Sequence, residues 1–176
     1  MTTQPPPPVP GDDRDWTFVI TEGCAECGFR PLDREDLADW FAAQSNRWRD
    51  VLTRPAVGER PSAQVWSPLE YGRHVQDMLA VLAERIEAML GLDRPMLADW
   101  DGDAKAVELE YWNADPMQTL SELQGSAVHA GRILRRVSGE DWERAGLRSD
   151  GMSFTVTTMS QYIAHEMQHH LHDAGA

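Results

Sequence analysis

The residues from Ser67 to Leu90 repeat apolar side chains at the spacing of an α-helix, and no other segment constrains the fold as strongly. Ser67 is a preferred N-cap residue, Pro68 suits the first helical position, and Glu70 completes a capping box. Gly91 marks the other end. The inner stripe of this helix is expected to comprise Tyr71, Val75, Met78, Leu82, Ile86 and Met89.

Three further segments carry the same periodicity. The first is expected to begin at Asp33, as N-cap, and to end near Leu52. The second follows Asp115 and ends near Ser138, before a glycine. The last begins around Thr155, where β-branched residues make the first turn weak by propensity.

Four amphipathic helices of about 18 to 24 residues with one long crossover predict an all-α four-helix bundle. The crossover, about residues 92–114, joins helices two and three. Residues 1–14 are proline-rich and are expected to form a disordered or extended leader. Residues 16–20 are apolar and form either a β-like strand or a segment that lies on the bundle. Residues 15–176 are therefore expected to form a single domain with an irregular N-terminal part.

Acidic residues outnumber basic ones by 29 to 16, which gives a formal charge of −13. An acidic chain without a basic cluster repels phosphate backbones, so nucleic acid is not an expected partner. No run of about 18 apolar residues is present, which argues against a membrane span. The N-terminal residues lack the basic and apolar parts of a secretory signal. We therefore expect a cytoplasmic protein.

Four of the six histidines fall between residues 165 and 172. At ~100° per residue, His165, His169 and His172 return to one side of a helix, while His170 points away. A single ion fits the pair His165 and His169 or the pair His169 and His172, and either pair needs a ligand from another element. Histidines are also favoured at the negative end of a helix without any metal.

Cys24 and Cys27 are the only cysteines, and their spacing suggests metal or redox chemistry. Two histidines could complete a zinc site with this pair. A thioredoxin-like function lacks the βαβ context that it requires. The alternative is a turn with two small, partly buried residues.

His74 lies at the edge of the apolar stripe of helix two. A single histidine at such a border is more often a hydrogen-bonded core residue than a ligand. The ligand interpretation gains weight because the histidine pair near the C-terminus lacks a donor. Asp77, one turn on, could orient His74 or lie in solvent.

Two motifs resemble the DinB-like superfamily, which includes the YfiT-like proteins and the mycothiol-dependent maleylpyruvate isomerases. Residues 66–74, WSPLEYGRH, are similar to the WSxxE-x3-H opening of its helix two, and residues 165–169, HEMQH, to the HxxxH motif of its last helix. The resemblance covers about residues 33–173 and implies a four-helix bundle that binds a divalent metal, often zinc or nickel, through three histidines. On this chain the three are His74, His165 and His169.

The leader sequence Cys24-Ala-Glu-Cys27-Gly-Phe resembles an actinobacterial branch of these proteins. The leader, together with His170 and His172, departs from the simple family pattern. These four residues leave open a second metal site or a thiol near the first one. Related bundles are often dimers, so a homodimer is a further expectation from the resemblance.

The first functional hypothesis is a metal-dependent enzyme that acts on a small molecule with a low-molecular-weight thiol of the mycothiol type, as an S-transferase or isomerase. An open three-histidine zinc site lowers the pKa of a bound thiol and presents a thiolate nucleophile. Glu166 and Asp77 are weak candidates for moving protons. The same site could hold water and act as a hydrolase.

The second hypothesis is a non-catalytic metal-binding or stress-associated bundle. It expects a closed metal shell with a fourth protein ligand, such as a cysteine, and no pocket beside the metal. An open coordination position would favour the enzyme. A third hypothesis leaves the histidines inert and assigns the bundle to dimerisation alone.

Overall fold

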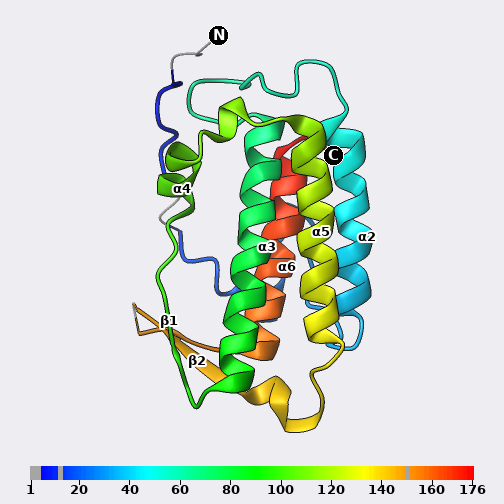
Figure 1. Cartoon of the computed structure of the whole chain (residues 1–176), viewed down its shortest axis with the longest axis vertical. Helices are drawn as coiled ribbons and strands as arrows, with labels where there is room; N and C mark the ends of the chain where they lie inside the picture. Colours follow the sequence, from blue (N-terminus) through cyan, green and yellow to red (C-terminus); the bar gives the residue numbers. More distant parts are fainter. Residues whose placement is uncertain (1–4, 12–13, 150) are drawn as a thin grey trace.

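Four long helices run side by side in the computed structural model, which describes residues 5–11, 14–149 and 151–176 (Figure 1). Helix α3 packs against α5 and α6, and α2 packs against the same two helices. The four helices are α2 (Leu37–Leu52), α3 (Pro68–Gly91), α5 (Pro116–Leu134) and α6 (Val156–Asp173). This arrangement confirms the expected all-α four-helix bundle.

Helix α3 begins at the predicted capping box. The Ser67 hydroxyl accepts from the Glu70 backbone N–H at 3.3 Å, and the Glu70 carboxylate accepts from the Ser67 N–H at 2.8 Å. Glu70 is 1% exposed and is also paired with the Arg60 guanidinium, whose Nε lies 2.9 Å from one carboxylate oxygen. The helix start is therefore a buried polar network in which each charge has a partner.

Replacing Ser67 with alanine is expected to lower the free energy of unfolding by about 1–2 kcal/mol. The cap is lost, and the buried Glu70 carboxylate loses a hydroxyl donor at 2.8 Å. Urea denaturation followed by circular dichroism would measure the change. Ser121→Ala on the exposed face of α5 is the matched control and should change stability by less than about 0.5 kcal/mol. Equal effects of the two substitutions would contradict this role for the cap.

Helix α2 begins later than predicted. It starts at Leu37, and Asp36 rather than Asp33 occupies the N-cap position. The Asp36 backbone N–H donates to the Asp33 carbonyl at 2.9 Å, which closes a separate turn before the helix. The prediction of Asp33 as N-cap was wrong because several acidic residues there offer similar helix-start signals.

Helix α5 ends earlier than predicted, at Leu134 rather than Ser138. The N–H groups of Arg136 and Val137 each donate to a carbonyl three residues back, at 3.0 Å. The chain therefore tightens into a 3₁₀-type turn before Gly139, as helix ends often do.

A small sheet at one end of the bundle was not predicted (Figure 1). Strand β1 (Met96–Leu97) of the crossover pairs in parallel with β2 (Ala145–Arg148), and β2 pairs antiparallel with β3 (Ser153–Thr155). The same crossover continues into α4 (Gly102–Glu108) and the 3₁₀ helix η1 (Tyr111–Asn113), and a second 3₁₀ helix, η2 (Gly139–Glu143), precedes β2. The crossover is thus structured, and it brings α4 against α3.

The N-terminal part of the chain lies along the bundle. Residues 16–20 do not form a strand; the last two of them begin the short helix α1 (Val19–Glu22), which contacts α6. Further along, the Leu32 N–H donates to the Gln161 side chain of α6 at 3.0 Å. Residues 1–4 and 12–13 of the predicted disordered leader lie outside the described residues. Within the described chain, no helix has both the length and the apolar character needed to cross a membrane.

Candidate metal centre and adjoining pocket

The turn that carries the two cysteines is fixed to helix α6. Gly23 has a φ of +78°, and a side chain there would place its Cβ 2.5 Å from the Phe29 carbonyl oxygen. The Cys24 N–H donates to that same carbonyl at 2.9 Å, which closes the turn. The Cys27 carbonyl accepts from the Gln168 side chain of α6 at 2.8 Å. The glycine and the Gln168 bond therefore hold both thiols against the histidine face of α6.

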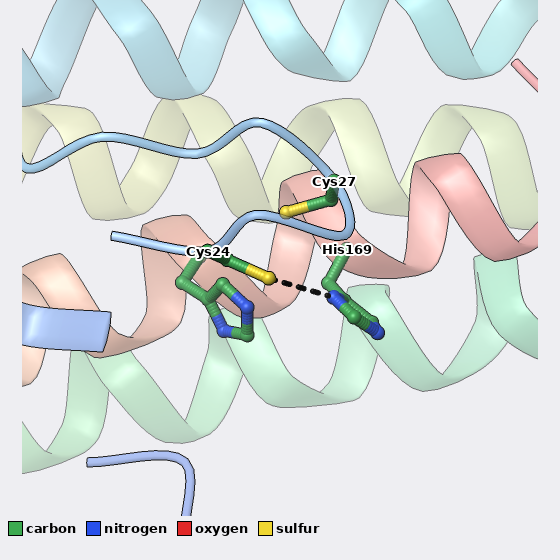
Figure 2. Close-up of side chains that lie close together, drawn as sticks. Cys24, Cys27 and His169 are labelled. Carbon is green, nitrogen blue, oxygen red and sulfur yellow. Dashed lines mark hydrogen bonds between the residues drawn. The ribbon is translucent and has the colours of Figure 1, made fainter. Parts of the chain in front are cut away.

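Four potential metal ligands converge at this contact. One ligand atom from each of Cys24, Cys27, His165 and His169 lies within 4.8 Å of the others. Figure 2 shows the Cys24 thiol directed toward His169, with its sulfur 3.7 Å from the ring Nδ1, and the Cys27 thiol in the same turn. Over residues 5–11, 14–149 and 151–176, this is the only group of three or more such side chains with this spacing.

The outer nitrogens of the two histidines face carboxylates. The Nδ1 atom of His165 lies 2.9 Å from a Glu166 oxygen, and the Nε2 atom of His169 lies 3.7 Å from an Asp173 oxygen. The Nε2 atom of His165 is buried and has no hydrogen-bond partner. Metal-binding histidines commonly present one nitrogen to the ion and the other to a carboxylate. The pattern of partners therefore fits a metal ion between the thiols and the imidazoles.

The two thiols differ in acidity. Burial raises the pKa of Cys24, but hydrogen bonds from the turn backbone and from His165 outweigh it, so that this pKa lies below its ordinary value. Burial and the adjacent Cys24 raise the pKa of Cys27 to about 11. Burial lowers the pKa of His165, yet the Glu166 carboxylate more than compensates and the net shift is upward. The Cys24 thiol therefore ionises more readily than the Cys27 thiol, and a divalent ion would favour the thiolate form of both.

A cavity of about 300 Å³ adjoins the cluster. His169 belongs to both, because it is a member of the cluster and also lines the cavity. The remaining wall is polar and aromatic and comes from the leader, α3, α4 and α6: Val9, Pro10, Arg14, Trp16, Trp66, Tyr71, His74, Gly102, Asp103, Tyr162, Glu166, His170 and Asp173.

His74 is a buried residue in the wall of the cavity. Its ring centroid lies 4.8 Å from that of His170 and 5.0 Å from that of Trp66. The side chain is 8% exposed, and its Nδ1 atom is buried without a hydrogen-bond partner. Burial, and then the nearby His170, hold the pKa of His74 well below its ordinary value of 6.5. His74 is therefore a neutral imidazole at pH 7.

The depressed pKa of His74 predicts a pH dependence of stability in the metal-free protein. Because the unfolded chain takes up this proton first, its contribution is fully present above about pH 6.5 and is lost as the pH falls toward the folded-state pKa. His74→Gln should remove up to ~1.4 kcal/mol per pH unit from the slope below pH 6.5. Urea denaturation of chelator-treated protein between pH 7.5 and 5.5 measures the slope. His129→Gln on the exposed face of α5 is the control, and identical slopes for wild type and His74→Gln would contradict the expectation.

The structure divides the histidines expected to bind metal. His165 and His169 lie together, as the helical spacing predicted, and their neighbours are the two cysteines. His74 packs against His170, on the cavity side. Cys24 and Cys27, expected as a second site or a nearby thiol, meet the same two histidines. The assignment of His74, His165 and His169 as one ligand set stays a prediction.

The other candidate residues occupy different places. Asp77 pairs with the Tyr111 hydroxyl and lies 3.7 Å from the Arg73 guanidinium. Glu166 lies between His165 and His170, with one oxygen 3.7 Å from the His170 ring. His172 is exposed on α6.

Sequence reasoning missed part of the cavity wall. Asp103 belongs to α4 and Arg14 to the leader, and neither stands in a recognisable motif. One signal for a second site was available in the adjacent pair His169-His170. Neighbouring side chains on a helix point ~100° apart, so the two histidines can face two different sites.

Comparisons with known proteins agree with this architecture. The family model of the DinB superfamily matches residues 53–174. Among solved structures, the chain is similar to YfiT from Bacillus subtilis, described as a probable metal-dependent hydrolase with an unusual four-helix bundle topology. The TM-score is 0.72 at 15% sequence identity, over 80% of this chain and 85% of that one. No curated protein matches the chain significantly.

Proposed function

The chain belongs to the DinB superfamily, and from this premise we propose that it is a zinc-dependent enzyme that transforms a small molecule in the cavity beside the metal. The observation that carries the proposal is the convergence of Cys24, Cys27, His165 and His169. The buried, unpaired Nε2 of His165 is the atom that a bound ion would satisfy.

The donor set favours zinc over nickel. Two thiolates and two imidazoles are a common tetrahedral zinc set, whereas nickel prefers square-planar or tetragonal surroundings. When bound, zinc would neutralise the thiolates and join the leader to α6. Four protein donors fill a tetrahedral shell and leave no position for a substrate. We therefore assign the zinc a structural role in the cavity wall, and we assign the reaction to the side chains that line the cavity.

Hydrolysis is the reaction class that we favour. His74 is neutral at pH 7 and could accept a proton from a water molecule. His170, whose ring centroid lies 4.8 Å from that of His74, and Glu166, 3.7 Å from His170, lie in the same wall and could pass this proton from His74 to a leaving group. The description of YfiT as a probable metal-dependent hydrolase supports this class.

Thiol transfer is the second form of the proposal. A low-molecular-weight thiol could lose its proton to the same neutral His74 and react as a thiolate. The cavity of about 300 Å³ has room for a small cosubstrate. This second form of the proposal includes a mycothiol-type S-transferase or isomerase.

A non-catalytic bundle is the rival, and the filled four-donor shell favours it. That hypothesis also requires the absence of a pocket beside the metal. The cavity shares His169 with the cluster, and this contact favours the enzyme.

The test is elemental analysis of protein purified without a histidine tag, followed by hydrolase and thiol-transfer screens. About one zinc per chain is expected, together with a turnover that His74→Gln reduces by about 10²-fold or more at unchanged zinc content. The control Gln118→Ala lies on the outer face of α5 and should leave turnover unchanged.

Zinc at one per chain with no turnover of any substrate, and with a His74→Gln variant indistinguishable from wild type, would support the non-catalytic bundle. If protein that has been refolded with excess zinc is folded but contains no zinc, the metal assignment itself would be contradicted.

A further inference from the structure

Cys24 and Cys27 lie close enough to react with each other. Both are free thiols, and they belong to one turn of the chain (Figure 2). Their sulfurs are among the four ligand atoms that all lie within 4.8 Å of one another. A disulfide holds its sulfurs at about 2.05 Å, so the two thiols would have to approach by at most about 3 Å to form one.

The two thiols differ in their access to solvent. Cys27 is partly exposed, whereas Cys24 is buried and only 5% exposed. Zinc binding requires both sulfurs as thiolates, and the thiolate is the form of cysteine that peroxides oxidise. A dissolved oxidant therefore meets Cys27 first, and Cys24 is the neighbouring thiolate that can attack the oxidised sulfur.

The reaction that joins the two sulfurs balances with one hydroperoxide as the oxidant. With hydrogen peroxide, the Cys27 thiolate attacks one peroxide oxygen, the O–O bond breaks, and a sulfenic acid and hydroxide form. The Cys24 thiolate then attacks the Cys27 sulfur, the S–S bond forms, and a second hydroxide leaves. Two protons from solvent convert both hydroxides to water. The thiolates have then lost two electrons, and the peroxide has gained them.

The disulfide is a poor ligand for zinc. Its sulfurs carry no charge and lie about 2.05 Å apart, whereas two sulfurs on one tetrahedral zinc are roughly 3.8 Å apart at ~2.3 Å per bond. Oxidation leaves His165 and His169 as the remaining members of the four-donor cluster. Two imidazoles fall short of the four donors of a structural zinc site, so we expect the ion to be released.

Trp16 connects the cluster to the cavity. Its ring centroid lies 5.2 Å from that of His165 and 4.8 Å from that of His169, and the same side chain lines the cavity. Bound zinc fixes both imidazoles, and it therefore also fixes the surface against which Trp16 packs. Release of zinc would loosen this part of the cavity wall.

Other contacts keep the turn on helix α6 when the sulfurs no longer bind zinc. The Gln168 side chain donates to the Cys27 carbonyl at 2.8 Å, and the Leu32 N–H donates to the Gln161 side chain at 3.0 Å. Neither bond involves a sulfur atom, so both can persist in the oxidised protein. Reduction of the disulfide would then return both thiols to their places beside the histidines.

From the adjacent thiols, the exposure of Cys27 and the packing of Trp16, we infer that the Cys24–Cys27 pair is a redox switch. A hydroperoxide converts the pair to a disulfide, zinc leaves, and the cavity wall at Trp16 loosens. The inference rests on the proposed function in that zinc occupies the cluster. It adds regulation to that function, because activity in the cavity would fall under oxidising conditions and return on reduction.

The test adds hydrogen peroxide in steps to zinc-loaded protein. A chromophoric chelator reports released zinc, and alkylation with mass spectrometry counts the thiols. About one equivalent of peroxide consumed should release the zinc, with both alkylation sites and two hydrogens lost from the protein. A thiol reductant and added zinc should restore the starting state.

Tryptophan fluorescence tests the connection to the cavity. The emission should shift to longer wavelength as zinc is released, because Trp16 becomes more accessible to water. Trp16→Phe should lose most of this shift and still release zinc.

Two further variants control for the reaction. Cys27→His keeps four potential donors but has no second thiol, so it should retain zinc at least about tenfold longer than wild type in the same peroxide. Met117→Leu removes an exposed, oxidisable methionine of α5 and should leave zinc release unchanged. The mass of oxidised wild-type protein tests disulfide formation independently of both variants.

Retention of zinc and of both free thiols at about ten equivalents of peroxide would overturn the switch and leave the zinc proposal intact. Zinc release with oxygen atoms added to the cysteines, and without a disulfide, would also overturn it. A fluorescence shift that persists in Trp16→Phe would overturn the connection to the cavity. Folded protein that holds no zinc even after loading would contradict the proposed metal, and with it the switch.

Discussion

Serine in place of Cys24 is expected to weaken zinc binding by at least ~100-fold, so that zinc content falls from about one ion per chain to near zero after dialysis. The physical reason is the loss of a buried thiolate whose sulfur lies 3.7 Å from the His169 ring nitrogen. His165→Gln should have the same effect, because its unpaired Nε2 is one of the four donors. Zinc competition with a chromophoric chelator measures the affinity.

Two variants control for this result. His172→Gln changes an exposed histidine of the same helix and should retain zinc. His74→Gln should also retain zinc, because His74 packs against His170 and not within the four-donor cluster. Loss of zinc in His74→Gln and its retention in Cys24→Ser would reverse the assignment and support the three-histidine set expected from the sequence.

Removal of zinc is expected to destabilise the protein by about 4 kcal/mol when free zinc is ~1,000-fold above its dissociation constant. The loss should be concentrated where the leader meets α6. Hydrogen exchange would then accelerate at the Cys24 N–H, which donates to the Phe29 carbonyl in the metal-bearing turn. Amides in the middle of α5 serve as the internal control, because that helix lies outside the cluster.

Chelation followed by urea denaturation and exchange mass spectrometry measures both quantities. Uniform acceleration of exchange across all helices would contradict a local role for the ion. An unchanged unfolding midpoint after verified zinc loss would contradict the stabilisation.

The bundle could be predicted from the sequence because the helical periodicity is clear and two of the four helix starts depend on local signals. Ser67 with Glu70, and Asp115 before Pro116, start helices through contacts within a single turn. Asp33 failed as a cap because Asp36 offers the same signal three residues later. The sheet was missed because its strands have two to four residues and form only by pairing β1 with β2 across the chain.

The site was only partly predictable for a related reason. Helical spacing placed His165 and His169 on one face, but it could not select their partner. Which side chains complete the site depends on how the N-terminal segment that carries Cys24 and Cys27 packs on α6. This packing involves long-range hydrogen bonds such as that from the Gln168 side chain to the Cys27 carbonyl. Local periodicity contains no information on such contacts, so His74 and the cysteine pair were equivalent candidates.

Helix α6 repeats the same four-residue interval twice, displaced by one position. His165 and His169 face the thiols, while Glu166 and His170 face the cavity. The two pairs therefore depend on the same helical register. An insertion or deletion between residues 166 and 169 would rotate His169 and His170 by ~100° relative to His165 and Glu166, and would disrupt both pairs at once. In homologues we therefore expect substitutions at single positions of this segment, or joint loss of the two cysteines, but no change in the length of residues 165–173.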